Sequence, residues 1–188
     1  MHVLRASDHK RMPWKNGGGE TVEIAVFPPH ATVDDFDWRI SMATVASDGP
    51  FSIFPRIDRT LSILDGKGMS LAIDGAGPVL LTTSSEPLSF AADVPVAATL
   101  ADGTINDLNV MTRRGRFSHR VERMIGSFSI SPTERNETVL VLPTDQISIS
   151  SNAQKMELEH LDAVFLHGAA DVTAAENIVS YVIRLSTV

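Results

Sequence analysis

The chain has 188 residues, no cysteine, a formal net charge of −7 and 43% hydrophobic residues. The absence of cysteine excludes a disulfide framework and a thiol nucleophile, and the excess of acidic residues argues against broad binding to a nucleic-acid backbone. No stretch approaches the ~18 uninterrupted apolar residues of a membrane span, and the N-terminal residues lack the apolar segment of a secretory signal, so we expect a cytoplasmic protein with no nucleic-acid or membrane partner.

Short segments of alternating polarity predict β-strands along the whole chain. A half-buried strand alternates polar and apolar residues at every second position, as do residues 21–26, 39–43, 70–73, 146–149 and 156–159. Residues 61–64 and 139–142 are more apolar and predict strands that are buried more fully.

Turn signals separate these segments at short intervals. Combinations of Asp, Gly and Pro that favour turns occur at residues 48–50, 65–68, 74–75, 102–103 and 143–145. We expect a helical turn only before Trp14 or within residues 169–177. The pattern predicts an all-β sandwich or barrel of many short strands.

An internal repeat indicates that the strands form two related units. Residues 49–55 are echoed by residues 126–132, residues 59–73 by residues 137–151, and residues 88–94 by residues 157–163. Three echoes in the same order predict two copies of one β-unit. We place the N-terminal segment and the first unit in residues 1–115 and a second, smaller unit in residues 116–188, packed on the first.

The hairpin signature around Arg59 and Gly66 resembles the first motif of the cupin barrel. That resemblance assigns the two histidine positions of the motif to Ile53 and Pro55 and its carboxylate position to Arg59. In the second unit the same positions are Ile130, Pro132 and Glu137. Because a divalent metal needs several converging N, O or S ligands, we expect no metal and no other cofactor.

The whole chain resembles the HutD/Ves family of cupin-like proteins. The signature in residues 12–19 is followed by the family's patterns in residues 38–41, 48–52 and 107–114. The resemblance implies a double-barrel (bicupin) fold and a bacterial protein associated with histidine utilisation or stress response. It also implies a small-molecule binder that limits pathway activity, with formylated or urocanate-type compounds as ligands.

Arg59 is the leading candidate for a ligand anchor. At the cupin ligand position its side chain would point into the first barrel, where an uncompensated buried charge is strongly unfavourable. Its partner is either an internal carboxylate such as Asp107 or an anionic ligand, since guanidinium presents two parallel N–H donors to a carboxylate.

Two further groups complete the predicted site. The glycine-rich loop that begins with Trp14, Lys15 and Asn16 is either a flexible turn or one wall of a ligand pocket, since glycine allows close approach of the backbone.

Asp107 and Asn109 lie two residues apart on a predicted strand and therefore face the same side; they are either a satisfied polar pair or ligand contacts. Arg39 shares a face with Ser41 in the same way. We predict ligand contacts from Trp14, Lys15, Asn16, Arg39, Arg59, Asp107 and Asn109.

These residues leave three functions open. The first is a protein that binds a small carboxylate or a formylated metabolite, has no catalytic residue and regulates a catabolic pathway. The second is a metal-free cupin enzyme, an isomerase or hydrolase, with Asp107 or Glu23 as its general base. The third is an interaction protein whose barrels are filled by side chains. Edge strands can pair across a dimer, so a homodimer stays open as well.

Overall fold

The computed structural model describes residues 1–14, 17–131, 136–152 and 154–188. In this part of the chain the regular structure is β-strand except for one short 3-10 helix, η1 (Ala6–Asp8). The all-β prediction is therefore confirmed. No helix among the described residues has the length and hydropathy needed to cross a membrane.

The chain divides into two compact units, which we describe separately. The first unit is Lys10–Ser118, and the second combines Met1–His9 with His119–Val188. The first nine residues were predicted to belong to the first unit. They belong to the second because β1 (His2–Leu4) pairs antiparallel with β17 (Ala163–Leu166).

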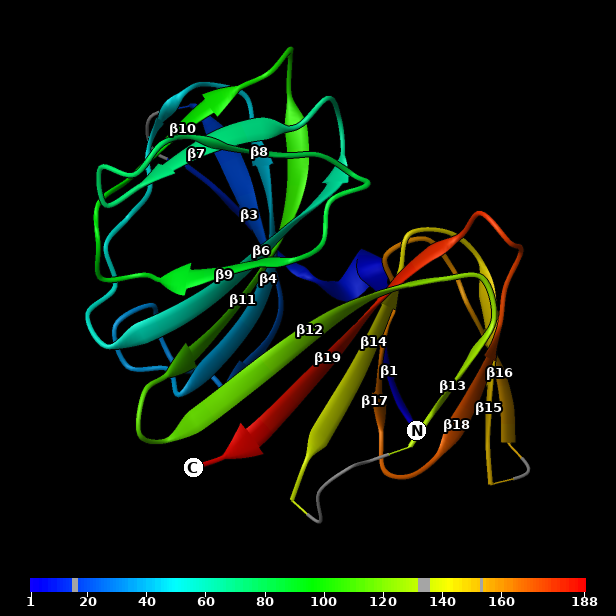
Figure 1. The fold of residues 1–188 in the computed structure, drawn as a ribbon. Coiled ribbons are helices and arrows are strands. Elements are labelled where there is room, and N and C mark those ends of the chain that lie inside the picture. The colour runs from blue at the N-terminus through cyan, green and yellow to red at the C-terminus, as the bar shows by residue number, and fades with distance from the viewer. Residues whose placement is uncertain (15–16, 132–135, 153) are drawn as a thin grey trace. The chain divides into compact units, whose positions relative to one another are not determined.

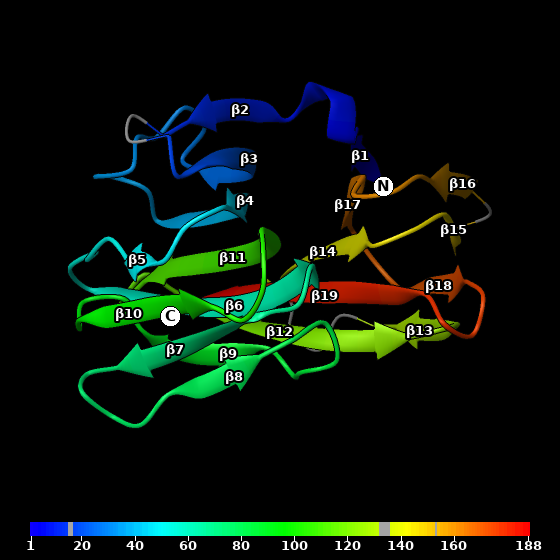
Figure 2. The same ribbon diagram turned by 90° about the horizontal axis from the view of Figure 1, so that it is seen from above.

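The first unit contains two sheets (Figure 1). The six-stranded sheet has the order β2 (Lys10–Pro13), β3 (Gly19–Phe27), β4 (Trp38–Val45), β11 (Ile105–Arg113), β6 (Ile57–Asp65) and β9 (Leu88–Ala91). The four-stranded sheet has the order β5 (Gly49–Pro50), β10 (Val96–Leu100), β7 (Met69–Ile73) and β8 (Val79–Leu81). Figure 2 shows β2, β3 and β4 following one another at one edge of the larger sheet.

The second unit has the same construction. Its five-stranded sheet has the order β1, β17, β14 (Thr138–Pro143), β19 (Val179–Thr187) and β12 (Phe117–Ile125). Its four-stranded sheet has the order β13 (Phe128–Ile130), β18 (Ala170–Thr173), β15 (Ile147–Ser151) and β16 (Gln154–Leu158). Within the described residues, the ladders join the strands of each unit into two separate sheets and not into one closed barrel.

Strand order shows how the two copies of the repeat correspond. The order β5-β10-β7-β8 in the first unit matches β13-β18-β15-β16 in the second, and β4-β11-β6-β9 matches β12-β19-β14-β17. The first two sequence echoes follow this correspondence. The third echo does not. Residues 88–94 contain β9, and the counterpart of β9 is β17, which begins at Ala163. Most of residues 157–163 instead form the end of β16 and a turn.

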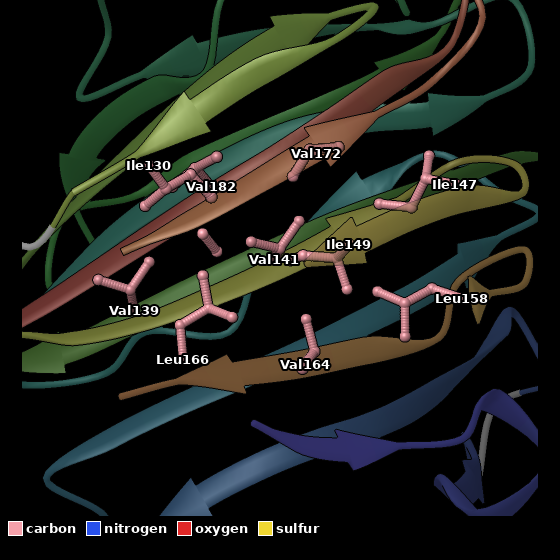
Figure 3. Close-up of a cluster of buried hydrophobic side chains, with 11 residues drawn as sticks. Ile130, Val139, Val141, Ile147, Ile149, Leu158, Val164, Leu166, Val172 and Val182 are labelled. Carbon is pink, nitrogen blue, oxygen red and sulfur yellow. The ribbon is translucent and has the colours of Figure 1, made fainter. Parts of the chain in front are cut away.

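Apolar residues from both sheets of each unit form its core. In the first unit, Leu61 and Ile63 of β6 pack in one cluster with Leu71 of β7 and Ala98 of β10. Figure 3 shows the equivalent cluster of the second unit, where Val139 and Val141 of β14 meet Ile147 and Ile149 of β15. Burial of apolar surface between two sheets is the main stabilising term of such a sandwich.

One local prediction is wrong, and another holds in one of its two alternatives. Residues 48–50 were expected to form only a turn, but Gly49 and Pro50 pair with Ala98 and Ala97 of β10 as the short strand β5. Residues 169–177 contain the strand β18 where a helical turn was one alternative. The other alternative, a helical turn before Trp14, is met by η1.

Candidate functional site

A group of polar side chains lies on the inward face of the six-stranded sheet. Asp107 of β11 pairs with Ala43 of β4 and Ile63 of β6, and both of these neighbours belong to the core between the sheets. Cross-strand partners in an antiparallel ladder project to the same face. Asp107 therefore faces the interior of the unit, and alternation along β11 gives Asn109 the same orientation, as predicted.

Two arginines flank β11 at Met111, two residues beyond Asn109. Met111 of β11 pairs with Arg59 of β6 on one side and with Arg39 of β4 on the other. The ladder thus places both guanidinium groups on the face that carries Asp107 and Asn109. The sheet brings together four of the seven predicted site residues, namely Arg39, Arg59, Asp107 and Asn109.

Arg59 is buried, with 6% of its surface exposed. Its guanidinium carbon lies 5.1 Å, 5.3 Å and 5.9 Å from the ring centroids of Phe51, Phe54 and Phe90. Nη2 donates to the sulfur of Met111 over 3.5 Å, and the buried Nε atom has no hydrogen-bond partner among the described residues. Ring faces stabilise a cation, but they do not accept the hydrogen bonds that the N–H groups of a buried guanidinium can donate to oxygen atoms.

Burial lowers the pKa of Arg59 to about 10, the nearby Asp107 acts to raise it, and Arg39 acts to lower it. Arg59 therefore remains a cation at neutral pH. Among the described residues, no carboxylate oxygen lies within ion-pair distance of its nitrogens. The predicted alternative of a direct Arg59–Asp107 ion pair is thus not formed, although the two charges interact.

Asp107 is the most deeply buried acid of the site, with 1% of its surface exposed. The Nδ2 group of Asn109 donates to its Oδ1 over 2.5 Å. Burial raises the pKa of Asp107 to about 7, against the lowering effects of the Arg59 charge, a backbone hydrogen bond at Ala43 and the bond from Asn109. At neutral pH this carboxyl group is poised between its two protonation states.

Arg39 is already paired inside the unit. Its Nε donates to Oε2 of Glu23 over 2.7 Å, with both side chains largely buried. Glu23 pairs with Ser41, so Arg39, two residues away on β4, is a diagonal neighbour of Glu23 on the same face of the sheet. The ion pair leaves Arg59 as the cation of the site without a bonded carboxylate in the described part of the chain.

Trp14 lies beside the core of the first unit at the start of the glycine-rich loop. Its indole Nε1 donates to Oγ1 of Thr21 over 2.8 Å, and its backbone N–H donates to the carbonyl of Gly19 over 2.9 Å. A Cβ atom on Gly19 would lie 2.9 Å from the Trp14 ring and 2.2 Å from the carbonyl oxygen of Thr44. Gly19 is therefore required by close packing of the loop. Lys15 and Asn16, the other two predicted site residues, lie outside the described residues.

At the positions of the cupin metal motif, Ile53 is exposed and Glu137 is already paired. Ile53 is 55% exposed. In the second unit, Glu137 accepts from Nη1 of Arg184 over 2.8 Å, so the carboxylate is held in an ion pair. In the part of the chain that the structure describes, no three His, Asp or Glu residues form a group that could hold a metal ion.

Three phenylalanines around Arg59 were not identified from the sequence. Phe90 is the cross-strand partner of Arg59 on β9, so the register of the β6–β9 pair would have found it. Phe51 and Phe54 lie between β5 and β6 in a segment without strand structure, where alternation gives no orientation. The pairing of Glu23 with Arg39 was also missed, because alternation along each strand does not give the register between β3 and β4.

Comparisons with known proteins agree with this architecture. The model of the family described as HutD matches residues 6–180. Protein Ves of Cronobacter sakazakii is 44% identical over 113 residues, which are 58% of this chain and 60% of that protein. The chain thus aligns with less than two thirds of the length of this relative.

Two solved structures are similar over nearly their whole length. A conserved protein of unknown function from Pseudomonas aeruginosa PAO1 has a TM-score of 0.88 at 34% identity, with 98% of each chain covered. HutD from Pseudomonas fluorescens SBW25 has a TM-score of 0.84 at 30% identity and covers 100% of this chain and 98% of its own.

A more distant likeness identifies the type of fold. A Cupin 2 conserved barrel domain protein from Leptotrichia buccalis superposes with a TM-score of 0.59 at 11% identity, covering 94% of this chain and 96% of its own. At this identity the likeness concerns the fold alone, which is therefore cupin-like.

Proposed function

Because the chain belongs to the HutD/Ves family, we propose that it binds a small carboxylate or a formylated metabolite at Arg59, without a metal. The observation that carries this proposal is the state of the Arg59 side chain. The guanidinium is buried among three rings, its Nε has no hydrogen-bond partner in the described chain, and its one acceptor is a sulfur atom. A carboxylate would supply two oxygen acceptors in the geometry that guanidinium fits best.

The residues around Arg59 supply the remaining contacts of the proposed site. Arg39 keeps its Nη donors for a ligand because Glu23 accepts from its Nε. Asn109 and Asp107 would bond to polar groups of the ligand beyond its carboxylate. Trp14, with Lys15 and Asn16 next to it in the sequence, would form the loop side of the site.

One relative suggests a first compound to test. The structure of HutD from P. fluorescens SBW25 is described as a formate condition. Formate is the smallest carboxylate and has the same charged group as the proposed ligands. It is therefore the simplest probe for the Arg59 site.

The broader setting follows from family membership and is part of the proposal. A regulatory role in histidine catabolism or stress response, a cytoplasmic location and a possible homodimer remain predictions. The matching strand orders of the two units support a bicupin, in which each unit is a distorted cupin-like barrel opened into two sheets.

Calorimetric titration with formate, acetate and N-formyl amino acids tests the proposal. We expect Arg59→Ala to weaken binding by more than tenfold, because the variant loses the cation whose donors are free to hold the anion. Arg120→Ala is the matched control, since Arg120 is exposed in the second unit and pairs with Glu122. Ligand at 100 times its Kd should also add about 2.7 kcal/mol to the free energy of unfolding. Equal affinity of wild type and Arg59→Ala would remove the anchor role.

A second function is favoured by one observation, the pKa of Asp107 near 7. A general base acts best when its pKa lies close to the working pH, so Asp107 fits a metal-free isomerase or hydrolase. Incubation with formylated amino acids and urocanate-like compounds, followed by chromatography, separates the two functions. Turnover that Asp107→Asn abolishes would establish an enzyme, whereas binding without product supports the binder.

A further inference from the structure

Asp107 and Arg59 occupy adjacent strands on one face but do not form an ion pair. Their positions are offset along the ladder, since Asp107 pairs with Ile63 and Arg59 with Met111. The Asp107 carboxylate is held instead by the side chain of Asn109. Arg59 therefore acts on Asp107 through its charge alone, and it keeps its N–H donors for another acceptor.

The other groups that face Asp107 are few. On β4 and β3 these are Arg39 and Glu23, which neutralise each other in an ion pair. The residues that the opposite sheet contributes to the core are apolar, for example Leu71 of β7, Leu81 of β8 and Ala98 of β10. Arg59 is thus the group whose charge has the most direct effect on Asp107 in the described chain.

We propose that the site takes up its carboxylate ligand together with one proton, which Asp107 accepts. The inference rests on the proposed function and specifies it further. The ligand is a monoanion whose charge is balanced by Arg59, and Asp107 becomes a neutral carboxylic acid when the ligand binds. The bound site then carries one ligand anion beside one guanidinium and no second free negative charge. Asp107 also gains an O–H donor for a polar atom of the ligand.

The direction of this coupling follows from electrostatics. In the free protein, the charge of Arg59 favours the ionised form of Asp107, against the effect of burial. An anion bound to Arg59 cancels that charge and adds a like charge near Asp107, and both changes favour protonation. Below about pH 7 Asp107 is already largely protonated, so binding takes up few further protons from solvent. Above about pH 7 the proton must come from solvent, and affinity should fall by about tenfold per pH unit.

Proton uptake can be measured directly by calorimetry of formate binding in phosphate, HEPES and Tris buffers, whose ionisation enthalpies differ. We expect an uptake of about one proton per formate at pH 8 and close to none at pH 5.5. Asp107→Asn should bind formate with no proton uptake and with an affinity that does not change between these pH values. Glu23→Gln tests the neighbouring acid: Asp107 is still present in this variant, so proton uptake at pH 8 should persist even though loss of the pair with Arg39 changes the affinity.

The possible results separate this inference from the proposed function. If the wild-type protein binds no carboxylate at either pH, the proposed function fails and the proton coupling fails with it. If formate binds through Arg59 but the measured heats do not depend on the buffer at pH 8, the proposed function stands and the coupling is overturned. Uptake that persists in Asp107→Asn and disappears in Glu23→Gln would assign the proton to Glu23, which also overturns the inference. The wild-type buffer series decides the question even if a variant does not fold.

Discussion

The Nη2 atom of Arg59 lies 3.5 Å from the sulfur of Met111, its cross-strand partner on β11. A thioether sulfur is a weak acceptor, so this contact fixes the position of the side chain without satisfying the guanidinium. The three phenylalanine rings complete an apolar surround that keeps the charge away from water. Such a cation is held in place but retains hydrogen-bonding capacity, as an anion-binding site requires.

The first prediction concerns the ring surround of Arg59. Phe90→Leu keeps an apolar side chain on β9 but removes the ring whose centroid lies 5.9 Å from the guanidinium carbon. Loss of a cation–π contact of about 0.5–1 kcal/mol lets the guanidinium sample other positions, and we expect a roughly two- to fivefold weaker affinity for formate in calorimetry.

Phe27→Leu is the control for this change, because Phe27 stacks on Trp38 and not on Arg59. Its affinity for formate should match that of the wild type. Equal affinities in all three proteins would mean that the ring of Phe90 does not position the anchor.

The second prediction compares two carboxylates of β3. Glu23 is paired with Arg39 and both side chains are largely buried, whereas Glu20 is paired with Arg11, of which 64% is exposed. Removing one partner of a buried pair leaves an uncompensated charge, so Glu23→Gln should lower the free energy of unfolding by about 2–3 kcal/mol. Glu20→Gln should lower it by less than about 1 kcal/mol. Urea denaturation of both variants measures the difference, and similar losses would contradict the assignment of Glu23 to a buried pair.

The fold was largely predictable because alternation reports which face of a strand is buried. Asp107 and Asn109 were expected on one face of a strand, and β11 places them there. The first two echoes of the repeat likewise follow the matching strand orders of the two units. Residues 2–4 form a strand too short to show alternation, and their partner β17 lies about 160 residues away in the sequence. Pairing over such a distance is set by tertiary packing and not by local pattern.

The site was predictable only where it depends on strand periodicity. Arg59 follows from its position in the motif that covers β6 and the turn before β7, but the surroundings of its guanidinium do not. Phe51 and Phe54 reach it from an irregular segment whose backbone angles no local pattern specifies. Likewise, the contact of Arg39 with Glu23 depends on the register of β3 against β4, which pairs Glu23 with Ser41 and which alternation alone does not give.

The third prediction is a dependence of stability on pH that comes from Asp107. Its pKa rises from 3.8, the ordinary value of an aspartate side chain, to about 7 in the folded protein. Between about pH 4 and pH 7 the folded state therefore holds a proton that the unfolded chain releases, so this group contributes stability at low pH that is lost as the pH rises through 7. At 1.36 kcal/mol per unit, the whole effect is on the order of 4 kcal/mol.

Asp107→Asn removes the titration and keeps the shape of the side chain. We expect the variant to be more stable than the wild type by about 2–4 kcal/mol at pH 8 and nearly equal to it at pH 4. The lower end of this range allows for the loss of the carboxylate charge near Arg59. Denaturant unfolding at the two pH values measures both differences. A variant less stable than the wild type at pH 8 would show that the ionised carboxylate is a net stabilising group.

The fourth prediction concerns Asp162, which holds the N-terminal segment to the second unit. Its carboxylate accepts from the backbone N–H of Ala6 over 2.8 Å, from Nη1 of Arg5 over 2.5 Å and from the backbone N–H of Glu159 over 3.0 Å. Burial acts to raise the pKa of Asp162, but the hydrogen bonds and the charge of Arg5 outweigh it and lower the pKa. The stabilisation from this group is therefore present at neutral pH and is lost as the pH falls into the acidic range.

Asp162→Asn retains one carbonyl acceptor but loses the charge and the second oxygen. We expect a loss of about 1–2 kcal/mol in the free energy of unfolding at pH 7, and faster hydrogen exchange at the amides of β1, because β1 is an edge strand held by β17 and by this anchor. The difference from the wild type should shrink as the pH falls through the acidic range, because the carboxyl group of the wild type then takes up its proton. Asp8→Asn in the exposed part of η1 is the control, and it should leave the exchange of β1 unchanged. If both variants exchange equally fast, the segment is held by its strand pairing and not by Asp162.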